Sequence, residues 1–466
     1  MEIKVSNDVK NLAVDVLAIN MFEGEKTSQE LANTYAIDRD GFKGKLGETY
    51  LLQTYGQIPA QKILVTGCGK RDEFGENEAR IAVYKSVKKM QQMFAKTAAF
   101  DFDCGFDYGK SGAIGAMLAD YAFDKYKSKK AAGLDEITFA NVLEESVKAG
   151  IGFGKAMKFA RDLANEPAAY ATPSKLAEIA QNIEGVTTEV YNKDEIERMG
   201  MGAYLAVSKG SVEPPRFIHM KYTGKNVKKK IAIIGKGICF DSGGLDLKPP
   251  SSMLTMRDDM SGAACVLGVM NALKEFNPDV EVHGIIAACE NMPGCGAYKP
   301  GDILTAKNGK TIEVDNTDAE GRLTLADALV YACELGVDEV IDIATLTGAC
   351  MVALGTAAAG IMGNDEDMIH RIIETGKNAG EKFWQLPLYK EYFDSLKSDI
   401  ADMKNTGSRN GGASAAGVFL QEFVKDVKWA HIDIAGTAFL DKPEKEFIKG
   451  ATGSGVRTLL SYILNL

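Results

Sequence analysis

Two acidic side chains close to an arginine mark a stretch of this sequence whose residue types could do chemistry. In the segment 316–323, Asn-Thr-Asp-Ala-Glu-Gly-Arg-Leu, Asp318 and Glu320 lie two residues apart and Arg322 follows two residues later. A solvated turn that caps the next helix would be an ordinary role for such a pair. However, an arginine at a helix start forms an anion site. Carboxylates beside an anion site make sense when cations lie between them.

A second segment, 235–244, supplies further charged residues. It reads Gly-Lys-Gly-Ile-Cys-Phe-Asp-Ser-Gly-Gly, carries Lys236 and Asp241, and is followed by Lys248 and Asp259. Asp241 comes directly after apolar residues, where an unpaired carboxylate is costly. A pair of divalent cations would compensate these charges, and two such ions can activate a water and polarise a carbonyl or phosphoryl group. The two segments therefore predict a two-metal hydrolase, without deciding between a peptide and a phosphate ester.

Three of these residues have alternative roles that the spacing leaves open. Asp259 lies just before Ser261, a predicted helix cap, so it could serve the helix start. Lys236 could bind a metal as a neutral amine, because a nearby cation lowers the pKa of an amine. It could equally form a salt bridge with Asp241 or another local acid. Lys248 stands before two prolines and could point into the site as an electrophile or be exposed to solvent.

Histidine, the usual zinc ligand, is scarce in this chain. The four histidines are His219, His283, His370 and His431, and no His-Glu-x-x-His pattern occurs. A carboxylate-rich site without histidine favours Mg²⁺ or Mn²⁺, and Zn²⁺ is compatible with it.

Composition limits the class of protein. The 466 residues predict two domains, with three as the alternative. A content of 45% apolar and 25% charged residues is ordinary for a soluble globular protein. With 54 Lys and Arg against 64 Asp and Glu, the net charge of −10 argues against broad nucleic-acid binding. The eight cysteines form no Cys-x-x-Cys pair, which favours buried thiols in a reducing cytosol.

No membrane span is expected. The N-terminus lacks the apolar core of a signal peptide. The uncharged run 343–363 is long enough to cross a bilayer. However, it consists largely of Thr, Ala and Gly, so we interpret it as a buried strand end, a turn and small-residue packing.

Alternating strands and helices would position the acidic segments. In the N-terminal third we expect a strand over 12–20 that is interrupted at Asp15, a second and clearer strand at 62–67, and a helix over 77–96. A long helix over 137–164, ended by Asn165-Glu166-Pro167, would connect two α/β domains.

The C-terminal part repeats the alternation more clearly. Apolar strands are expected at 230–235, 280–288, 337–344 and 427–435, and helices at 262–276 and 324–335. This order predicts an α/β fold with a mostly parallel sheet covered by helices on both faces. Sites in such sheets form beyond the carboxyl ends of the strands, and both acidic segments are expected near such ends.

At this point the chain resembles a known family, the cytosolic leucyl aminopeptidases. The resemblance rests on five motifs: the segments 235–244 and 316–323, Met256-Arg-Asp-Asp-Met260, Glu290-Asn-Met-Pro293 with Pro300-Gly-Asp302, and Asp342-Ile-Ala-Thr-Leu-Thr-Gly348. It covers most of residues 160–466, and the N-terminal third matches only loosely.

The resemblance implies roles for individual residues. It implies five ligands for two divalent cations, with Asp241 and Glu320 bridging; the ligands are Lys236, Asp241, Asp259, Asp318 and Glu320. It implies that Lys248 contacts the substrate carbonyl oxygen and that Arg322, assisted by main-chain groups near Leu346, holds a bicarbonate that acts as general base. It implies that Met256, Thr345 and Gly348 line the pocket for the first side chain, and Asn316 and Ala319 the pocket for the next.

The resemblance also implies an architecture. It gives an N-terminal macro-like α/β module over 1–136, a connecting helix over 137–164 and a catalytic domain over 165–466, assembled as a cytoplasmic homohexamer. The substrates would be peptides with a free N-terminus, and the cations Zn²⁺ or Mn²⁺, with Mg²⁺ in one site. Asp246 departs from the family, since many relatives have serine there, and it could tune the environment of Lys248.

Two other functions compete with this interpretation. A two-metal phosphoesterase would use the same oxygens and would turn over phosphate esters. A non-catalytic or additional role in DNA binding or assembly would tolerate loss of the ligands, and all of the expected ligands are present in this chain.

Overall fold

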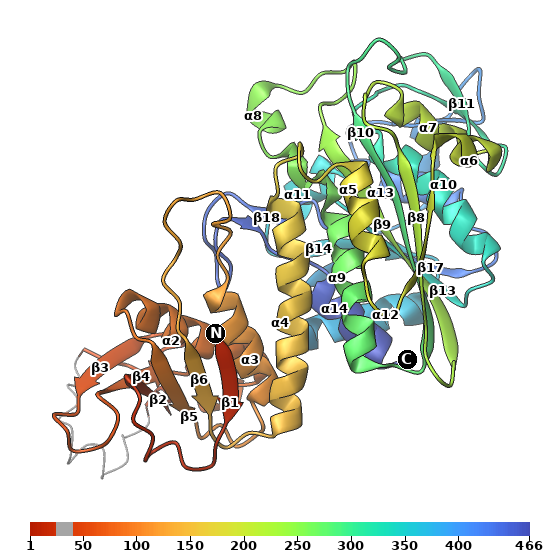
Figure 1. Cartoon of the computed structure of the whole chain (residues 1–466). Coiled ribbons are helices and arrows are strands. Elements are labelled where there is room, and N and C mark those ends of the chain that lie inside the picture. The colour runs from red at the N-terminus through yellow and green to blue at the C-terminus, as the bar shows by residue number, and fades with distance from the viewer. Residues whose placement is uncertain (25–40) are drawn as a thin grey trace. The chain divides into compact units, whose positions relative to one another are not determined.

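The computed structural model describes residues 1–24 and 41–466 and divides into two units. The first unit comprises Met1–Lys155 with Pro443–Ile448, and the second comprises Ala156–Lys442 with Lys449–Leu466 (Figure 1). The boundary falls inside a long helix, α4 (Glu144–Asn165), which lies in the range expected for a connecting helix. The division at residues 136 and 164 stays a prediction.

The first unit is built on a six-stranded sheet in the order β1-β6-β5-β2-β4-β3. All neighbours are parallel except β3, which runs antiparallel to β4. The strands are β1 (Glu2–Val5), β2 (Val16–Met21), β3 (Thr49–Gln53), β4 (Lys62–Gly67), β5 (Thr97–Asp101) and β6 (Glu136–Phe139). The helices are η1 (Arg71–Glu73), α2 (Glu76–Gln92) and α3 (Gly109–Asp120).

The elements predicted in this unit are present, but two of them begin later than expected. The strands at 16–20 and 62–67 and the helix from 77 are present as β2, β4 and α2. Residues 12–14 form no strand. The helix expected from 137 begins at Glu144, because residues 136–139 form β6 between β1 and β5. Their Ile-Thr-Phe sequence suits a buried strand, and the sheet supplies its partners.

The second unit contains an eight-stranded sheet in the order β15-β14-β17-β13-β9-β10-β8-β7. Its four central strands, β17, β13, β9 and β10, are parallel, as expected, while β8, β7 and β14 each pair antiparallel with a neighbour. The strands are β7 (Thr187–Tyr191), β8 (Arg216–Thr223), β9 (Lys229–Asp241), β10 (Val280–Asn291), β13 (Glu339–Ala344), β14 (Ala359–Gly363), β15 (Phe383–Gln385) and β17 (Lys428–Asp433).

Helices cover both faces of this sheet. Helix α9 (Ser261–Phe276) packs on β9 and β10 from one side and α10 (Gly321–Glu334) from the other (Figure 1). The remaining helices are α5 (Pro173–Gln181), α6 (Lys193–Arg198), α7 (Gly202–Ser208), α8 (Pro250–Met253), η2 (Met256–Met260), α11 (Gly348–Leu354), α12 (Glu366–Ala379), η3 (Lys390–Leu396), α13 (Gly412–Gln421) and α14 (Val456–Leu464). Short strands β11 (Ile303–Thr305), β12 (Thr311–Glu313) and β16 (Met403–Lys404) form a small sheet, and β18 (Phe439–Leu440) pairs with β19 (Gly450–Ala451).

The start of α9 differs from its prediction. Ser261 was expected to cap this helix, but it is the first helical residue and its hydroxyl donates to the carbonyl oxygen of Asp258 at 2.6 Å. The 3-10 turn η2 runs directly into α9, so the helix needs no separate cap. Asp259 therefore lies inside η2, and its side chain is available for other contacts.

The prediction for the uncharged run 343–363 is confirmed for its buried strand end and the turn, but the helix and the second strand in this run were not expected, and several of its residues are exposed. The run comprises the end of β13, a loop, α11 and β14. Among the described residues, no helix is long and apolar enough to cross a membrane. All eight cysteines are free thiols, five of them buried.

Two histidines on neighbouring strands form a buried chain of hydrogen bonds. His219 Nε2 lies 2.8 Å from His283 Nδ1, His283 Nε2 lies 3.1 Å from Glu281, and the Tyr331 hydroxyl lies 3.0 Å from His219 Nδ1. Two neutral imidazole rings can make all three of these hydrogen bonds, because each ring then has one donor and one acceptor nitrogen. Burial lowers the pKa of His219 to about 4, and the repulsion that a protonated His283 would exert acts in the same direction.

Because the pKa of His219 is lowered, we expect the protein to lose folding stability in mild acid. An unfolded histidine takes up a proton near pH 6.5, whereas folded His219 does so only near pH 4. The stabilising contribution is therefore present above pH 6.5 and is lost as pH falls toward 4. Between pH 7.5 and 5.0 we expect the free energy of unfolding to fall by roughly 2 kcal/mol more in the parent than in His219→Gln. Urea unfolding at both pH values measures this, and equal pH dependence would contradict it.

Candidate metal centre

The carboxyl ends of the four central strands converge on one region of the second unit. Asp241 ends β9, Asn291 ends β10, Asp433 ends β17, and Thr345 follows the last residue of β13. This is the edge of a parallel sheet at which sites form. Asp318 and Glu320 reach the region differently, from the loop between β12 of the small sheet and the start of α10.

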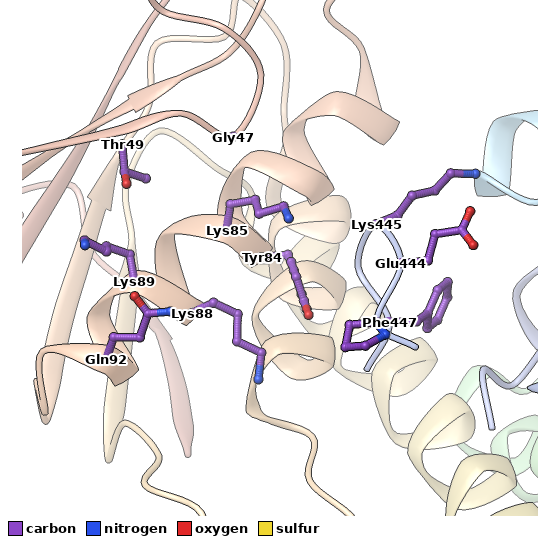
Figure 2. Close-up of a pocket in the computed structure, with 11 residues that line it drawn as sticks. Gly47, Thr49, Tyr84, Lys85, Lys88, Lys89, Gln92, Glu444, Lys445 and Phe447 are labelled. Carbon is purple, nitrogen blue, oxygen red and sulfur yellow. The ribbon is translucent and has the colours of Figure 1, made fainter. Parts of the chain in front are cut away.

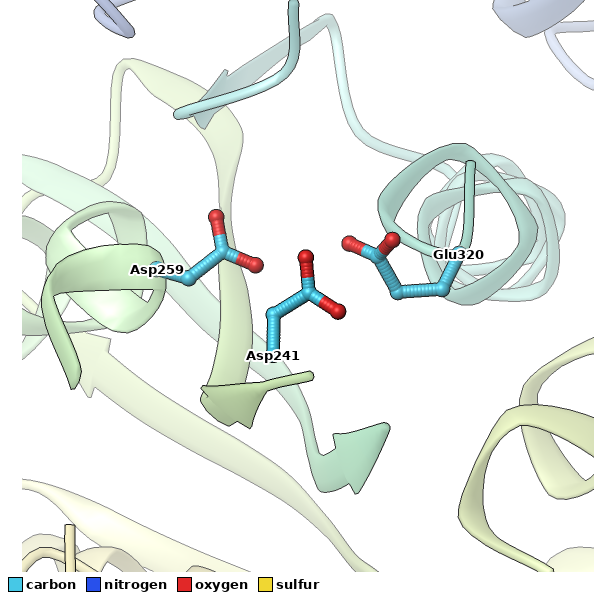
Figure 3. A group of neighbouring side chains, drawn as sticks. All are labelled: Asp241, Asp259 and Glu320. Carbon is cyan, nitrogen blue, oxygen red and sulfur yellow. The ribbon is translucent and has the colours of Figure 1, made fainter. Parts of the chain in front are cut away.

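Three buried carboxylates meet at this edge, as Figure 3 shows. Asp241, Asp259 and Glu320 each offer an oxygen within 4.8 Å of the others. Their exposed fractions are 2%, 5% and 1%. Like charges this close and this dry repel one another strongly. Opposite charge must therefore be supplied between them.

Lys236 supplies part of that charge. Its Nζ lies 2.7 Å from Asp259 Oδ1 and 2.8 Å from Glu320 Oε1, and it donates to the main-chain oxygen of Thr345 at 3.1 Å. Gly321 makes room for it, since a Cβ there would lie 2.5 Å from the lysine chain. Burial alone would lower the pKa of Lys236, but the surrounding carboxylates outweigh it and hold the pKa above its ordinary value. The salt-bridge alternative is thus present, with these two acids rather than Asp241 as partners.

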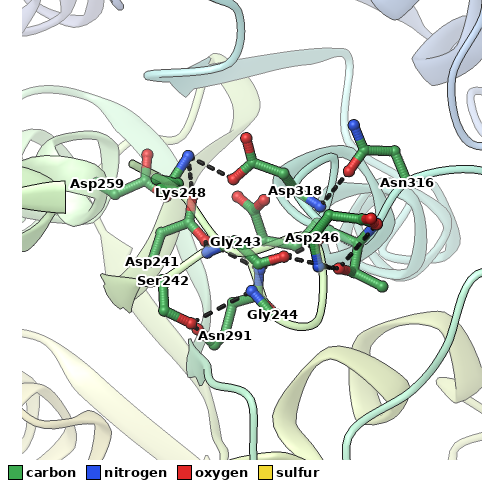
Figure 4. Close-up of polar contacts among 12 residues, drawn as sticks. Asp241, Ser242, Gly243, Gly244, Asp246, Lys248, Asp259, Asn291, Asn316 and Asp318 are labelled. Carbon is green, nitrogen blue, oxygen red and sulfur yellow. Dashed lines mark hydrogen bonds and ion pairs between the residues drawn. The ribbon is translucent and has the colours of Figure 1, made fainter. Parts of the chain in front are cut away.

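Lys248 points into the cluster rather than to solvent. Its Nζ lies 2.8 Å from Asp241 Oδ2 and 2.5 Å from Asp318 Oδ1 (Figure 4). Asp241 Oδ1 accepts from the main-chain N–H of Gly243 at 2.8 Å and from Asn291 Nδ2 at 2.9 Å. Burial, followed by the charge of Asp241, raises the pKa of Asp318 to about 6.

The donor set fits divalent cations. Four carboxylates face only two ammonium groups, so the cluster has an excess of negative charge. The second oxygens of Asp259 and Glu320 are buried and find no hydrogen-bond donor among the described residues. Buried polar atoms normally have partners. Oxygen-rich ligand sets of this kind suit Mg²⁺ or Mn²⁺, and Zn²⁺ can also use them.

Arg322 lies at the start of α10 with part of its guanidinium unused. Its Nη1 donates to the main-chain oxygen of Asn405 at 2.9 Å, and its buried Nε finds no acceptor in the described part of the chain. Burial lowers the pKa of Arg322 to about 10, which leaves it charged at neutral pH. The main-chain N–H of Leu346, expected to help hold an anion, already donates to Asp433 at 3.2 Å.

The residues expected to line substrate pockets border the same cluster. Thr345 donates its hydroxyl to Asp259 at 2.8 Å, and Met256 begins η2, which carries Asp259. Gly348 begins α11, directly after the loop that contains Leu346. Asn316 and Ala319 lie in the acidic loop, where the Asn316 side chain accepts from the N–H of Asp318 at 2.7 Å. Their contacts with substrate stay a prediction.

Sequence reasoning missed the polar residues that hold these loops. Buried Asn405 accepts from the N–H groups of Asp315 and Asn316 at 2.8 and 3.2 Å and donates to the carbonyl of Asn316 at 2.7 Å. Asn291 connects Asp241 to the carbonyl of Thr317, at 2.9 Å to each. Asn291 lies in one of the motifs above, but nothing in the local sequence around Asn405 indicates its role.

The first unit has a cavity of a different character. Its volume is about 410 Å³ (Figure 2). The walls include four lysines, with a single carboxylate; the charged lining residues are Lys85, Lys88, Lys89, Lys445 and Glu444. None of the residues predicted for catalysis lines it, and all of those lie in the second unit.

Comparison with known proteins places the chain among peptidases. The model for the catalytic domain of the cytosol aminopeptidase family matches residues 158–460, and the model for its N-terminal domain matches residues 18–130. Probable cytosol aminopeptidases from Persephonella marina, Aquifex aeolicus and Alkaliphilus oremlandii are 44%, 43% and 41% identical to it. Each alignment covers 100% of this chain and at least 99% of the relative.

Solved structures share the fold over nearly the whole chain. The bottromycin maturation enzyme BotP in complex with Mn superposes with a TM-score of 0.90 at 33% identity, covering 97% of this chain and 99% of that one. A mutant tomato leucine aminopeptidase superposes with a TM-score of 0.90 at 34% identity, covering 100% of this chain and 97% of that one.

Proposed function

The chain belongs to the cytosol aminopeptidase family, and from that premise we propose that it is a two-metal aminopeptidase of the leucyl type, with broad specificity, that releases the N-terminal residue from peptides with a free α-amine. The observation that carries the proposal is the buried group of Asp241, Asp259 and Glu320, whose oxygens lie within 4.8 Å of one another with two lysines beside them.

Five side chains would hold the two cations, with Asp241 and Glu320 shared between them. They are Lys236, Asp241, Asp259, Asp318 and Glu320. Zn²⁺ or Mn²⁺ would occupy the sites, with Mg²⁺ also accepted in one of them. When bound, such a pair of ions lowers the pKa of a water and polarises a carbonyl group. Lys236 would have to release its proton to serve as a ligand, which a nearby cation favours.

Two further residues would act on the substrate. Lys248, already 2.8 Å from Asp241, would turn its ammonium group to the carbonyl oxygen and stabilise the negative charge that develops there. Arg322 would hold a bicarbonate with its unused Nε, and such an anion supplies the chemistry of a general base. Met256, Thr345 and Gly348 would contact the first side chain of the peptide, and Asn316 and Ala319 the next.

The setting of the enzyme is also a proposal. We place it in the cytoplasm, on the ground that its relatives are named cytosol aminopeptidases. A homohexamer is the assembly that the family resemblance implies, and sedimentation equilibrium would test it.

Metal removal tests the proposed reaction. Stripping the enzyme with EDTA is expected to reduce its turnover rate for leucyl anilide by at least about 100-fold. Added Mn²⁺ or Zn²⁺ is expected to restore that rate. N-acetyl-leucyl anilide and a phosphate ester serve as controls and are expected to remain uncleaved by the restored enzyme. Metal-independent turnover of leucyl anilide would contradict the proposal, and preferential cleavage of the phosphate ester would favour a phosphoesterase instead.

A further inference from the structure

The two loops that carry the acidic cluster are tied together by a pair of residues outside the ligand set. Thr317 donates its main-chain N–H to Asp246 Oδ2 at 2.7 Å, and its hydroxyl lies 3.1 Å from the same oxygen. In return, Asp246 donates its main-chain N–H to the Thr317 hydroxyl at 2.9 Å. The hydroxyl itself donates to the carbonyl of Gly243 at 2.6 Å. We call this pair the Asp246–Thr317 clasp.

The clasp joins one half of the centre to the other. The loop 241–248 carries Asp241 at its start and Lys248 at its end, and the loop 316–320 carries Asp318 and Glu320. The two loops are 71 residues apart in sequence at the clasp. Apart from the clasp and its bond to Gly243, Lys248 connects the loops through its contacts with Asp241 and Asp318.

The first loop is folded tightly against the second. Gly243 and Gly244 have φ of +87° and +66°, a conformation that glycine adopts without strain. A Cβ on Gly243 would lie 3.0 Å from Asp318 Oδ1, and a Cβ on Gly244 would lie 3.0 Å from the Thr317 hydroxyl. The main-chain N–H of Lys248 donates to the carbonyl of Ser242 at 2.9 Å, which closes the turn. A tie at Asp246 therefore fixes where both ends of this loop lie relative to Asp318.

We propose that Asp246 is a positioning residue for the metal centre, which holds the Asp241–Lys248 loop against the Asp318–Glu320 loop. The proposal deepens the proposed function and rests on it. The clasp counteracts a specific force, because carboxylates of the two loops repel each other until cations are bound. A carboxylate that accepts from a main-chain N–H makes a strong, short hydrogen bond. Loss of the clasp lets the loops separate, so that fewer ligands are in place when a cation arrives.

The chain contains a matched control for this clasp. Thr311 donates its main-chain N–H to Asp402 Oδ2 at 2.7 Å and its hydroxyl to the same oxygen at 2.9 Å. Asp402 donates its main-chain N–H to the Thr311 hydroxyl at 3.0 Å. The same three contacts at Asp246 measure 2.7, 3.1 and 2.9 Å, but the Thr311–Asp402 pair joins β12 to the segment before β16 and touches no residue of the acidic cluster. Asp402→Ala therefore measures the effect of losing such a clasp away from the metal centre.

The test is Mn²⁺ binding to EDTA-stripped full-length protein by calorimetry. Partners that orient ligand groups typically affect metal affinity 10- to 100-fold when removed. Because Asp246 acts through the main chain of Thr317, we expect Asp246→Ala to weaken Mn²⁺ binding by about tenfold, the lower end of that range. Asp246→Asn keeps an acceptor for the Thr317 N–H and is expected to remain within about threefold of the parent. Asp402→Ala is expected to bind Mn²⁺ as the parent does.

Three calorimetric results would overturn the proposal. They are unchanged Mn²⁺ affinity in Asp246→Ala, an equal loss in Asp402→Ala, and an Asp246→Asn variant as weak as the alanine variant. Hydrogen exchange of the segment 316–320 in stripped protein gives a second readout that needs no metal. We expect faster exchange in Asp246→Ala than in the parent, and equal exchange would refute the clasp. If the parent itself bound no Mn²⁺, the proposed function would fail, while this exchange measurement would still decide whether the clasp holds the loops.

Discussion

Replacing Glu320 with alanine is expected to reduce kcat/KM for leucyl anilide by at least about 10³-fold, equivalent to about 4 kcal/mol of transition-state stabilisation. Glu320 is 1% exposed, lies with Asp241 and Asp259 within 4.8 Å, and has a second oxygen that no described donor satisfies. Its loss removes a proposed shared ligand of both cations. The metal-free variant is expected to stay folded, because Lys236 keeps Asp259 as a partner and one of three mutually repelling carboxylates is gone.

Glu313→Ala provides the matched control for this experiment. Glu313 lies seven residues earlier, on β12, and hydrogen-bonds Ser398 rather than the acidic cluster. Kinetics, circular dichroism and thermal unfolding of both variants separate a catalytic loss from a folding defect. Turnover by Glu320→Ala close to that of the parent would remove Glu320 from the site. An unfolded Glu320→Ala variant would show that its role is structural.

Replacing Lys236 with methionine is expected to have the largest effect on the metal-free protein. The ammonium group contacts Asp259 at 2.7 Å and Glu320 at 2.8 Å, and the lysine side chain is only 4% exposed. Breaking a buried ion pair on one side leaves the other charges uncompensated, which typically costs about 3–5 kcal/mol. We therefore expect a lower urea midpoint for metal-free Lys236→Met. Added Mn²⁺ is expected to recover part of the loss, because a cation can supply the missing positive charge.

Lys229→Met separates metal rescue from a general ion effect. Lys229 contacts Glu339 at 2.5 Å, and that glutamate is also buried. Both residues lie at the amino ends of their strands, β9 and β13, opposite the metal centre. Mn²⁺ is expected to raise the urea midpoint of Lys229→Met by no more than it raises the midpoint of the parent. Equal stability of the Lys236→Met variant and the parent without metal would show that the lysine does not compensate the carboxylates.

The strand and helix pattern predicted the four central strands of the second unit because they are nearly continuous apolar runs, and it missed β7, β8, β14 and β15 of the same sheet. Such runs as Lys230–Gly235 have few alternatives to a buried parallel strand. The same reasoning failed at 137–143, where a short Ile-Thr-Phe run was included in the following helix. Its strand conformation depends on pairing with β1 and β5, which a local pattern does not contain.

The acidic cluster was found from residue types, strand ends and family resemblance, but its supporting contacts were not. Asn405 hydrogen-bonds Asp315 and Arg322 across 90 and 83 residues of sequence, and no periodicity or motif connects these positions. The charge partners of Lys236 were likewise uncertain. Spacing pointed to Asp241, five residues away, whereas the direction of the lysine on β9 brings it to Asp259 and Glu320.

The central claim is that five side chains from distant segments hold two cations, and a crystal of the protein grown with excess Mn²⁺ tests it most directly. Anomalous diffraction at the manganese absorption edge is expected to show two strong peaks bounded by Lys236, Asp241, Asp259, Asp318 and Glu320. If crystals grown at a saturating concentration of Mn²⁺ showed no anomalous peaks among these side chains, the result would contradict the proposed metal centre and the reaction built on it.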